Sequence, residues 1–191
     1  MVREILVGER NAIVVAHCDD ETLFAAGLPL RFADREWTVI ACSIPRIDPV
    51  RADRFHAACR TLGVEGRVLP EVETEPGQRL NGLEVINLDS FDCIVTHNAW
   101  GEYGHNQHRH VHEFVKGRIK NQKLITFGYR EGGKGEFSLE LTHGELGRKL
   151  QALQCYDHIS PSDGKPKWEA LIEVYYNGKG INPAMETYDC E

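Results

Sequence analysis

The chain has 191 residues, of which 41% are hydrophobic and 27% are charged, and its 22 Lys and Arg against 29 Asp and Glu give a formal net charge of -7. This length is typical of a single domain, and the acidic balance argues against a nucleic-acid-binding protein, which normally carries a basic face. No apolar run approaches the roughly 18–20 residues that a membrane span needs, and the first residues lack a secretory signal pattern, so we expect a cytoplasmic protein with no membrane span.

The first part of the chain alternates strand patterns with helix patterns. Residues 12–16 (AIVVA) form a short continuous apolar run, which is typical of a strand buried on both faces. Residues 21–34 then place apolar side chains at helical spacing, with Asp19 or Asp20 positioned to cap the helix. The next expected elements are a strand at 37–43, a helix over 51–62 that Gly63 ends, and a strand at 64–69.

The second part of the chain repeats this alternation. Its expected elements are a strand at 91–96, a helix over 105–120, strands at 123–127 and 136–141, and helices over 144–155 and 167–176. Strands that alternate with helices of ten or more residues predict βαβ units and a parallel sheet, so the fold class is α/β. No internal repeat or linker-like stretch interrupts the chain, and we expect one domain over residues 1–191.

Cysteine and histidine are used very differently. The six cysteines are scattered without a Cys-x-x-Cys pair, so we expect reduced, structural thiols and no zinc ribbon. Histidine is the unusual part of the composition, because five of the nine fall within sixteen residues. These five are His97, His105, His108, His110 and His112.

Four polar side chains follow the first strand directly, within residues 16–21 (AHCDDE). They are one imidazole, His17, and the three carboxylates of Asp19, Asp20 and Glu21. In parallel α/β sheets, ligands bind beyond the carboxyl ends of the strands. Adjacent carboxylates repel each other, and a cation between them and the imidazole would relieve that repulsion. The alternative is that the two aspartates cap the helix and the glutamate favours its dipole.

A second polar segment, residues 96–108 (THNAWGEYGHNQH), follows another buried strand and should reach the same edge of the sheet. His105, His108 and His112 are spaced to share one helix face, whereas His110 points elsewhere and is expected to be solvated. Imidazole with carboxylate suits Zn²⁺, and three protein ligands plus water are the catalytic pattern. The two segments together predict a metal-dependent hydrolase.

Four segments resemble one family, in the right order along the chain. Residues 16–21 resemble the A-H-P-D-D-E signature of the LmbE-like, or PIG-L, N-acetyl-sugar deacetylases, and residues 96–108 are similar to a longer form of their G-H-P-D-H segment. Residues 51–64 (RADRFHAACRTLGV) resemble the family's R-x-x-E-x-x-x-A-x-x-x-L-G-V helix, and residues 149–156 (KLQALQCY) its late K-x-x-A-L-x-x-Y/H element. The resemblance implies a Rossmann-like three-layer domain with a mostly parallel sheet flanked by helices.

The resemblance also implies a role for individual side chains. The implied Zn²⁺ ligands are His17, Asp20 and His108. Asp19 is implied to be the general base, His105 the general acid and Tyr103 an oxyanion donor, while Arg51 is a candidate sugar or phosphate contact, or else a solvated helix residue. The implied partner is an N-acetylated amino sugar or sugar conjugate, and a homo-oligomer is left open as the assembly. This allocation is sound chemistry, since Zn²⁺ lowers the pKa of a bound water to about 7 and a carboxylate takes its proton.

The chain departs from the family's pattern at several positions. Cys18 replaces the signature proline and adds a thiol, which is an alternative zinc ligand. Asn106 and Gln107 replace Pro-Asp, so a carboxylate that would orient His105 is missing, although Gln107 still offers hydrogen bonds. His97 is expected to hydrogen-bond its loop, and His112 to support the site rather than ligate the metal.

Two alternatives stay open beside N-deacetylation of an amino sugar. One is an amidase that cleaves a larger acyl group or a thiol-sugar conjugate, and the other is a catalytically weak sugar-binding protein that keeps the metal. The choice of sugar is expected to lie in the loops at 44–49, 70–81 and 128–135. The last of these is glycine-rich but lacks the Ser or Thr of a phosphate-binding loop, so we expect it to form the rim of the site.

Overall fold

The first strand, β1 (Arg10–His17), runs through the centre of a sheet because its side chains are apolar on both faces. Ile13 and Val15 enter one core cluster, while Ala12 and Val14 enter a second cluster on the other face. We analysed a computed structural model that describes residues 7–73, 77–129, 135–159 and 164–190. The loops predicted at 70–81 and 128–135 therefore lie partly outside the described residues.

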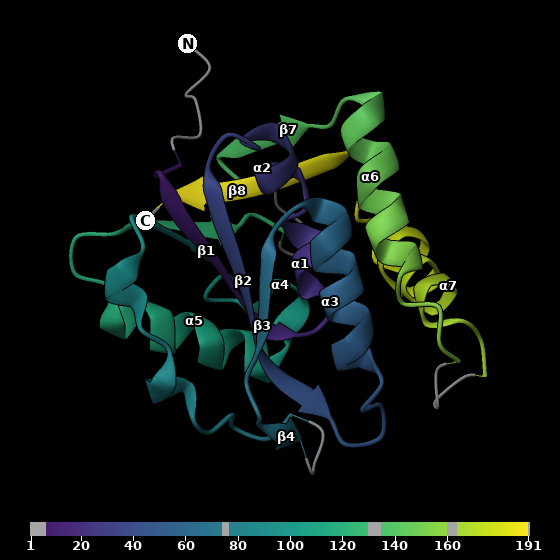
Figure 1. The fold of residues 1–191 in the computed structure, drawn as a ribbon, viewed down its shortest axis with the longest axis horizontal. Helices are drawn as coiled ribbons and strands as arrows, with labels where there is room; N and C mark the ends of the chain where they lie inside the picture. The colour runs from purple at the N-terminus through teal and green to yellow at the C-terminus, as the bar shows by residue number, and fades with distance from the viewer. Residues whose placement is uncertain (1–6, 74–76, 130–134, 160–163, 191) are drawn as a thin grey trace.

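The strands are arranged in the order β3–β2–β1–β5–β6–β8–β7 (Figure 1). The first five strands in this order run parallel to one another, which confirms the predicted mostly parallel sheet. At the edge, β8 pairs antiparallel with β6, and β7 pairs antiparallel with β8. Besides β1, the strands are β2 (Glu36–Pro45), β3 (Glu65–Val68), β4 (Val72–Glu73, paired with β2), β5 (Cys93–Thr96), β6 (Lys123–Phe127), β7 (Phe137–Glu140) and β8 (Met185–Cys190).

Helices cover both faces of the sheet, which confirms the expected three-layer α/β fold. In Figure 1, α5 lies on one side of β1 and β2, and α3 and α6 lie on the other. The helices are α1 (Asp20–Phe24), α2 (Gly27–Arg31), α3 (Arg51–Leu62), α4 (Gly101–Gly104), α5 (Asn106–Arg118), α6 (His143–Gln154) and α7 (Lys167–Leu171). Short turns of 3-10 helix at Leu83–Val85 and Leu88–Ser90 and a π-helical turn, η3 (Ile172–Gly178), complete the described elements.

Some predicted elements have different bounds in the structure. The helix expected over 21–34 divides into α1 and α2, because Pro29 has no N–H to bond the carbonyl of Ala25 and its ring would clash with that carbonyl. The helix expected over 167–176 ends at Leu171 and continues as the π-helical turn. The strand β8 was not predicted at all, since its inward-facing positions include a glutamate, Glu186.

A fully buried ion pair ties the C-terminal strand to the helical layer. Lys149 Nζ on α6 donates to Glu186 Oε1 on β8 at 2.7 Å and to the carbonyl of Leu23 at 3.1 Å. The Glu186 carboxylate also accepts the backbone N–H of Gly27, where a Cβ would come within 2.6 Å of that carboxylate. The pair therefore joins α1, α2, α6 and β8 at one point.

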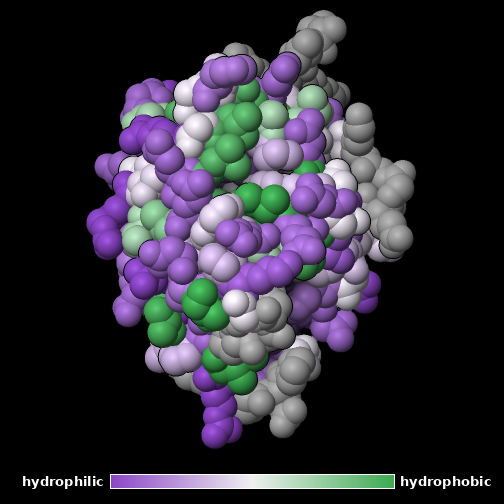
Figure 2. Space-filling view, turned by 90° about the vertical axis from the view of Figure 1, so that its right-hand side faces the viewer, coloured by the Kyte–Doolittle hydropathy of each residue, from purple (hydrophilic) through white to green (hydrophobic). Residues whose placement is uncertain are grey.

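The surface on the helical side is mostly hydrophilic. Figure 2 shows the face that lies on the right in Figure 1, where hydrophobic side chains form small separate groups between hydrophilic ones. No helix within the described residues has the length and apolar character required to cross a bilayer.

The chain order of the strands creates a switch point in the middle of the sheet. From β1 the chain proceeds to β2 and β3 on one side, and it returns to β5 and β6 on the other. Open α/β sheets bind ligands beyond the carboxyl ends of the strands at such a point. Here those ends are His17 on β1 and Thr96 on β5, so both polar segments reach the same edge of the sheet.

Candidate active site

Three atoms of metal-ligating types converge at the switch point, one from each of His17, Asp20 and His108. His17 Nδ1 lies 3.2 Å from Asp20 Oδ2 and 3.3 Å from His108 Nε2, and His108 Nε2 lies 3.4 Å from Asp20 Oδ2. Ligands about 2.0–2.1 Å from a tetrahedral metal ion are separated by about 3.3 Å. The three atoms thus form one face of a tetrahedron of the size that a zinc-like ion requires.

The ring nitrogens of His17 and His108 that point away from this cluster hydrogen-bond to neighbouring side chains. His108 Nδ1 lies 2.5 Å from Glu102 Oε2, so the ionised carboxylate accepts its N–H. His17 Nε2 lies 2.8 Å from Gln107 Oε1 and donates to that amide oxygen. With these protons on the outer nitrogens, a metal ion placed between the two inner nitrogens and Asp20 would meet a lone pair from each of them. Without a metal ion, a proton on His108 supplies the positive charge at this place. The donor set fits a divalent metal.

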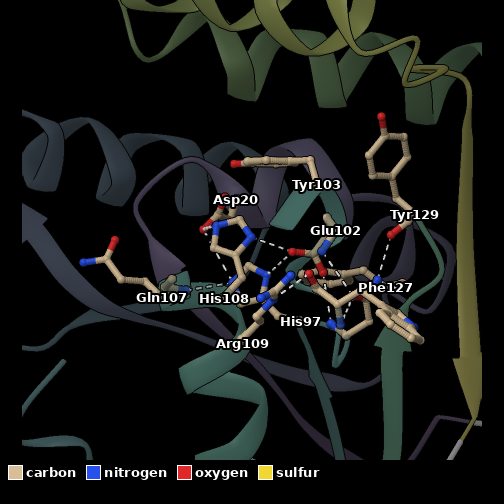
Figure 3. Close-up of polar contacts among 12 residues, drawn as sticks. Asp20, His97, Glu102, Tyr103, Gln107, His108, Arg109, Phe127 and Tyr129 are labelled. Atoms are coloured by element: carbon tan, nitrogen blue, oxygen red, sulfur yellow. Dashed lines mark hydrogen bonds and ion pairs between the residues drawn. The ribbon is translucent and has the colours of Figure 1, made fainter. Parts of the chain in front are cut away.

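Glu102 owes its position to a tightly tied loop after β5 (Figure 3). Asn98 Oδ1 accepts the N–H of Glu102 at 3.1 Å, and Asn98 Nδ2 donates to the carbonyls of Phe127 and Tyr129, both at 2.7 Å. Glu102 itself has φ 56°, an uncommon left-handed conformation for this residue type. This strained backbone conformation places the Glu102 carboxylate behind His108. Its role was not predicted from the sequence, where only the glycines around it signalled an unusual turn.

The charges of this buried group are strongly coupled. Burial lowers the pKa of His108, but Asp20 and Glu102 outweigh it and raise that pKa to about 10. Burial raises the pKa of Glu102, but His97 and His108 outweigh it and lower that pKa to about 2. Burial likewise raises the pKa of Asp20, which His108 and His17 hold well below its usual range. Both carboxylates stay ionised and favour positive charge between them.

His97 lies against the cluster but does not offer it a free lone pair. His97 Nε2 lies 3.5 Å from Asp20 Oδ2, yet His97 Nε2 already accepts the backbone N–H of Ala16 at 2.9 Å. His97 Nδ1 donates to Glu102 at 2.9 Å. The expectation that His97 hydrogen-bonds its loop is met by these contacts. His112, whose Nδ1 donates to the His97 carbonyl at 2.9 Å, supports the same loop.

His105 stands beside the three ligating atoms. Its ring centroid lies 4.9 Å from that of His17 and 4.5 Å from that of His108, close enough for the three rings to offer a second possible ligand set. Burial, followed by the nearby histidines, lowers the pKa of His105 to about 4. Its buried Nδ1 has no hydrogen-bond partner among the described residues. The Gln107 side chain hydrogen-bonds His17. No hydrogen bond between Gln107 and His105 is present among the described residues.

Asp19 occupies the N-terminal position of α1 in a strained conformation, with φ 131°. Glu21 holds this conformation, because its Oε2 accepts the Asp19 N–H at 2.9 Å while its Oε1 accepts the hydroxyl of Tyr156 at 2.8 Å. The Asp19 side chain caps nothing, and Asp20 instead turns back to accept the N–H of His17 at 2.9 Å. The helix-capping alternative for the two aspartates is therefore wrong.

Two cations face the Asp19 carboxylate. Arg51 Nη1 lies 3.5 Å and Lys167 Nζ 3.9 Å from Asp19 Oδ2. Burial raises the pKa of Asp19, against the lowering effect of the two cations. Arg51 is largely buried, and its Nε donates to Asp48 at 3.0 Å. The alternative that Arg51 is a solvated helix residue is therefore wrong.

These residues line a cavity of about 380 Å³, within the usual range of small-molecule sites. Its walls include His17, Asp19, Arg51, Tyr103, His105, Gln107, Lys167, Tyr175 and Lys179. The Tyr103 and Tyr175 hydroxyls lie 3.0 Å apart, and burial, with Tyr175 close by, raises the pKa of Tyr103 so that its hydroxyl stays protonated. Tyr175 was not predicted, because the π-helical turn that carries it has no clear sequence pattern.

Two further expectations change with the structure. Cys18 is buried in the core and its Sγ donates weakly to the Ser43 carbonyl at 3.9 Å, so it is directed away from the ligating atoms. Burial also raises its pKa well above the usual range, which disfavours a thiolate. His110 is only partly exposed and accepts the N–H of Leu80 at 3.1 Å, so the expectation that it is solvated is wrong.

No protein-family model matches the sequence, and no curated protein matches it. Solved structures do share the fold. The N,N'-diacetylchitobiose deacetylase from Pyrococcus horikoshii is 16% identical, over 96% of this chain and 84% of that chain, with a TM-score of 0.65. The A40926 pseudoaglycone deacetylase is 18% identical, over 94% of this chain and 96% of that chain, with a TM-score of 0.64.

The same fold also carries a different reaction. The 4-carboxy-2-hydroxymuconate hydratase from Pseudomonas putida KT2440 is 15% identical, over 95% of each chain, with a TM-score of 0.59. At these identities the likeness establishes the fold that the sequence resemblance implied, and nothing finer. The reaction has to be argued from the side chains of the cavity.

Proposed function

We propose that this protein is a metal-dependent hydrolase that removes the acetyl group from an N-acetylated amino sugar or amino-sugar conjugate. The carrying observation is the triangle of His17 Nδ1, Asp20 Oδ2 and His108 Nε2, whose sides measure 3.2–3.4 Å. Zn²⁺ is the proposed ion, because two imidazoles, one carboxylate and an open position match its catalytic sites. A bound ion of this kind lowers the pKa of water and polarises a carbonyl oxygen.

Asp19 is proposed to accept the proton of the attacking water. Its carboxylate lines the same cavity as His17, and Glu21 fixes its backbone beside the ligand Asp20. Arg51 and Lys167 face the carboxylate, and Arg51 is the nearer of the two cations. A positioned base of this kind contributes a rate factor of about 10²–10⁴.

Tyr103 and His105 are proposed to act on the other side of the acetamide. Tyr175 can donate to the Tyr103 oxygen across 3.0 Å, which leaves the Tyr103 O–H free to donate to the oxyanion. His105 lines the cavity next to Tyr103. Because its lowered pKa leaves the imidazole neutral, we propose that it relays to the departing amine the proton that Asp19 takes from the attacking water. The products are then acetate and a free amino sugar.

The setting of the enzyme is part of the same proposal. The cysteines are thiols outside any described disulfide, and four of them are buried. This fits a reducing compartment and supports the expectation of a cytoplasmic protein. The sequence likeness spreads over residues 16–156, which supports a single catalytic domain.

The direct test is acetate release from a panel of N-acetylated amino sugars, with the protein stripped by a chelator and reloaded with one metal at a time. A teicoplanin deacetylase with this fold has been solved in a zinc-inhibited form, so Zn²⁺ should be compared with Co²⁺, Mn²⁺ and Ni²⁺ at stoichiometric and excess levels. We expect acetate and amine in equal amounts, lost on chelation and restored by metal. Release of a larger acid favours an amidase, and saturable sugar binding without any hydrolysis contradicts the proposal.

A further inference from the structure

The cavity has a positive wall that deacetylation itself does not require. Among its described lining residues, Arg51, Lys167 and Lys179 are cationic, and Asp19 is the one carboxylate. The chain as a whole has a net charge of -7. The cavity is thus lined by positive charge although the net charge of the protein is negative. A cleft concentrates the resulting electric field on a ligand that enters it.

Arg51 accounts for little of this excess. Its Nε donates to the buried carboxylate of Asp48 at 3.0 Å, and its Nη1 faces Asp19 at 3.5 Å. His158 approaches Asp48 from the other side, with its Nε2 3.0 Å from the carboxylate. Arg51 is therefore held between two aspartates. The uncompensated positive charge of the wall belongs to the two lysines.

Lys167 is built into the wall at the first position of α7. Its backbone N–H donates to the His158 carbonyl at 2.8 Å, and its side chain is only 15% exposed. Its one described ion-pair contact, to Asp19 at 3.9 Å, is longer than a charge-assisted hydrogen bond, and Arg51 already faces the same carboxylate. A mostly buried ammonium with so weak a partner has donors to spare for a ligand in the cavity.

Lys179 reaches the cavity because of the π-helical turn η3. Its backbone N–H bonds the Val174 carbonyl at 2.9 Å, five residues back, which is the wider spacing of a π-helix. That spacing places Tyr175 and Lys179 on the same side of the turn, and both line the cavity. Lys179 Nζ lies 4.1 Å from the centroid of the Tyr103 ring. The cation is thus anchored over an aromatic ring, and no carboxylate pairs with it among the described residues.

From this arrangement we infer that the substrate carries an anionic substituent, a phosphate or a carboxylate, that Lys167 and Lys179 bind in the cavity. The inference rests on the proposed function for the position of the acetamide, which Asp19 and Tyr103 would face. It narrows the substrate class from N-acetylated amino sugars in general to acidic ones. Two ammonium groups on one wall suit a phosphate or carboxylate of either origin.

Kinetics with matched substrates test the inference. We would compare N-acetylglucosamine, N-acetylglucosamine 6-phosphate, N-acetylglucosamine 1-phosphate and N-acetylmuramic acid on the metal-loaded protein. We expect at least one acidic sugar to exceed the neutral one about tenfold in kcat/KM, mainly through KM, and this preference to shrink as salt is raised. The phosphate and carboxylate arms distinguish the two kinds of substituent.

Lysine variants locate the effect in the wall. Lys179→Met and Lys167→Met should each lower the ratio of acidic to neutral kcat/KM about tenfold, and Lys179→Arg should keep most of it. Lys123→Met, an exposed lysine at the start of β6, makes the same change in total charge and should leave the ratio unaltered. An unchanged ratio in both cavity variants would overturn the inference even if acetate is released.

A binding experiment separates this inference from the proposed function. Calorimetry with glucosamine and glucosamine 6-phosphate measures binding without any turnover. Tighter binding of the phosphate, lost in Lys179→Met, supports the anion site even if no acetamide is hydrolysed. Equal binding of the two ligands, together with normal deacetylation of neutral sugars, contradicts the anion site and leaves the proposed function standing.

Discussion

The carboxylate of Glu102 accepts the Nδ1–H of His108 at 2.5 Å, and His108 Nε2, on the other side of the ring, lies 3.4 Å from Asp20 Oδ2. The glutamate is buried and lies in α4, at a position whose backbone is not helical, whereas the histidine comes from the first turn of α5. A carboxylate behind a ligating imidazole fixes its tautomer and raises its basicity. On the proposed function, Glu102 would therefore prepare the metal site without itself ligating the ion.

Replacing that carboxylate should weaken metal binding. In Glu102→Gln, one carboxylate oxygen becomes an NH₂ group that faces a hydrogen-bond donor, either an imidazole N–H or the Asn98 N–H. We expect the Kd for Zn²⁺ to rise about 10–100-fold, as measured by competition with a chromogenic chelator. Glu113→Gln, on the exposed side of α5, is the matched control and should bind like the unchanged protein. Equal affinity in both variants would show that Glu102 does not prepare the site.

Asp19→Asn tests the proposed base without removing a ligand. The amide keeps the size of the side chain but cannot accept a proton from water, so kcat should fall about 10²–10⁴-fold with the metal content unchanged. Metal analysis of the purified variant accompanies the rate measurement. Asp53→Asn, at an exposed position in the first turn of α3, is the control. Normal turnover of a metal-loaded Asp19→Asn protein would refute the assignment.

The buried pair of Lys149 and Glu186 should dominate the stability of the C-terminal strand. Lys149→Met leaves the Glu186 carboxylate without its cation, and removing one partner of a buried pair costs about 3–5 kcal/mol. Urea unfolding measures the loss. Adding Glu186→Gln should recover part of it, because the remaining group is neutral. A loss of less than about 1 kcal/mol in the single variant would contradict this account.

A surface pair gives the fold a defined pH dependence. Arg31 donates to both oxygens of Glu145, at 2.7 and 2.9 Å, and lowers the pKa of Glu145 to about 2. Since the unfolded value is about 4.3, this stabilisation is present above that pH and is lost as the pH falls towards 2. Arg31→Gln should destabilise the protein by about 1 kcal/mol at pH 7 and by about half as much at pH 3, where Glu145 is still ionised in the folded protein. Urea midpoints at the two pH values measure this, and a constant difference would argue against it.

Helices and strands whose apolar spacing and end residues are both visible in the local sequence could be predicted from it. The helix α3 has the predicted bounds, because its apolar spacing runs from Arg51 to Leu62 and Gly63 ends it in a left-handed conformation, φ 78°. The strand β6 has its predicted bounds as well. The two aspartates after β1 could be singled out because two adjacent carboxylates at the end of a buried strand are costly without a cation.

Residues whose role depends on distant partners could not be predicted. Glu186 looks like a surface residue until Lys149, which comes from another element, is placed opposite it. Glu102 can reach His97 and His108 only through a left-handed turn that no propensity describes. Gln107 was expected to lie near His105 because of its position in the motif, but the start of α5 turns its side chain towards His17.

The central claim is that His17, Asp20 and His108 hold one catalytic metal ion. A crystal structure of the Zn²⁺-loaded protein, with anomalous scattering recorded at the zinc edge, measures this directly. We predict one peak about 2.0–2.2 Å from His17 Nδ1, Asp20 Oδ2 and His108 Nε2, with an open position towards the cavity. A peak ligated instead by His105, or by His97, or no peak at this edge of the sheet, would contradict the account.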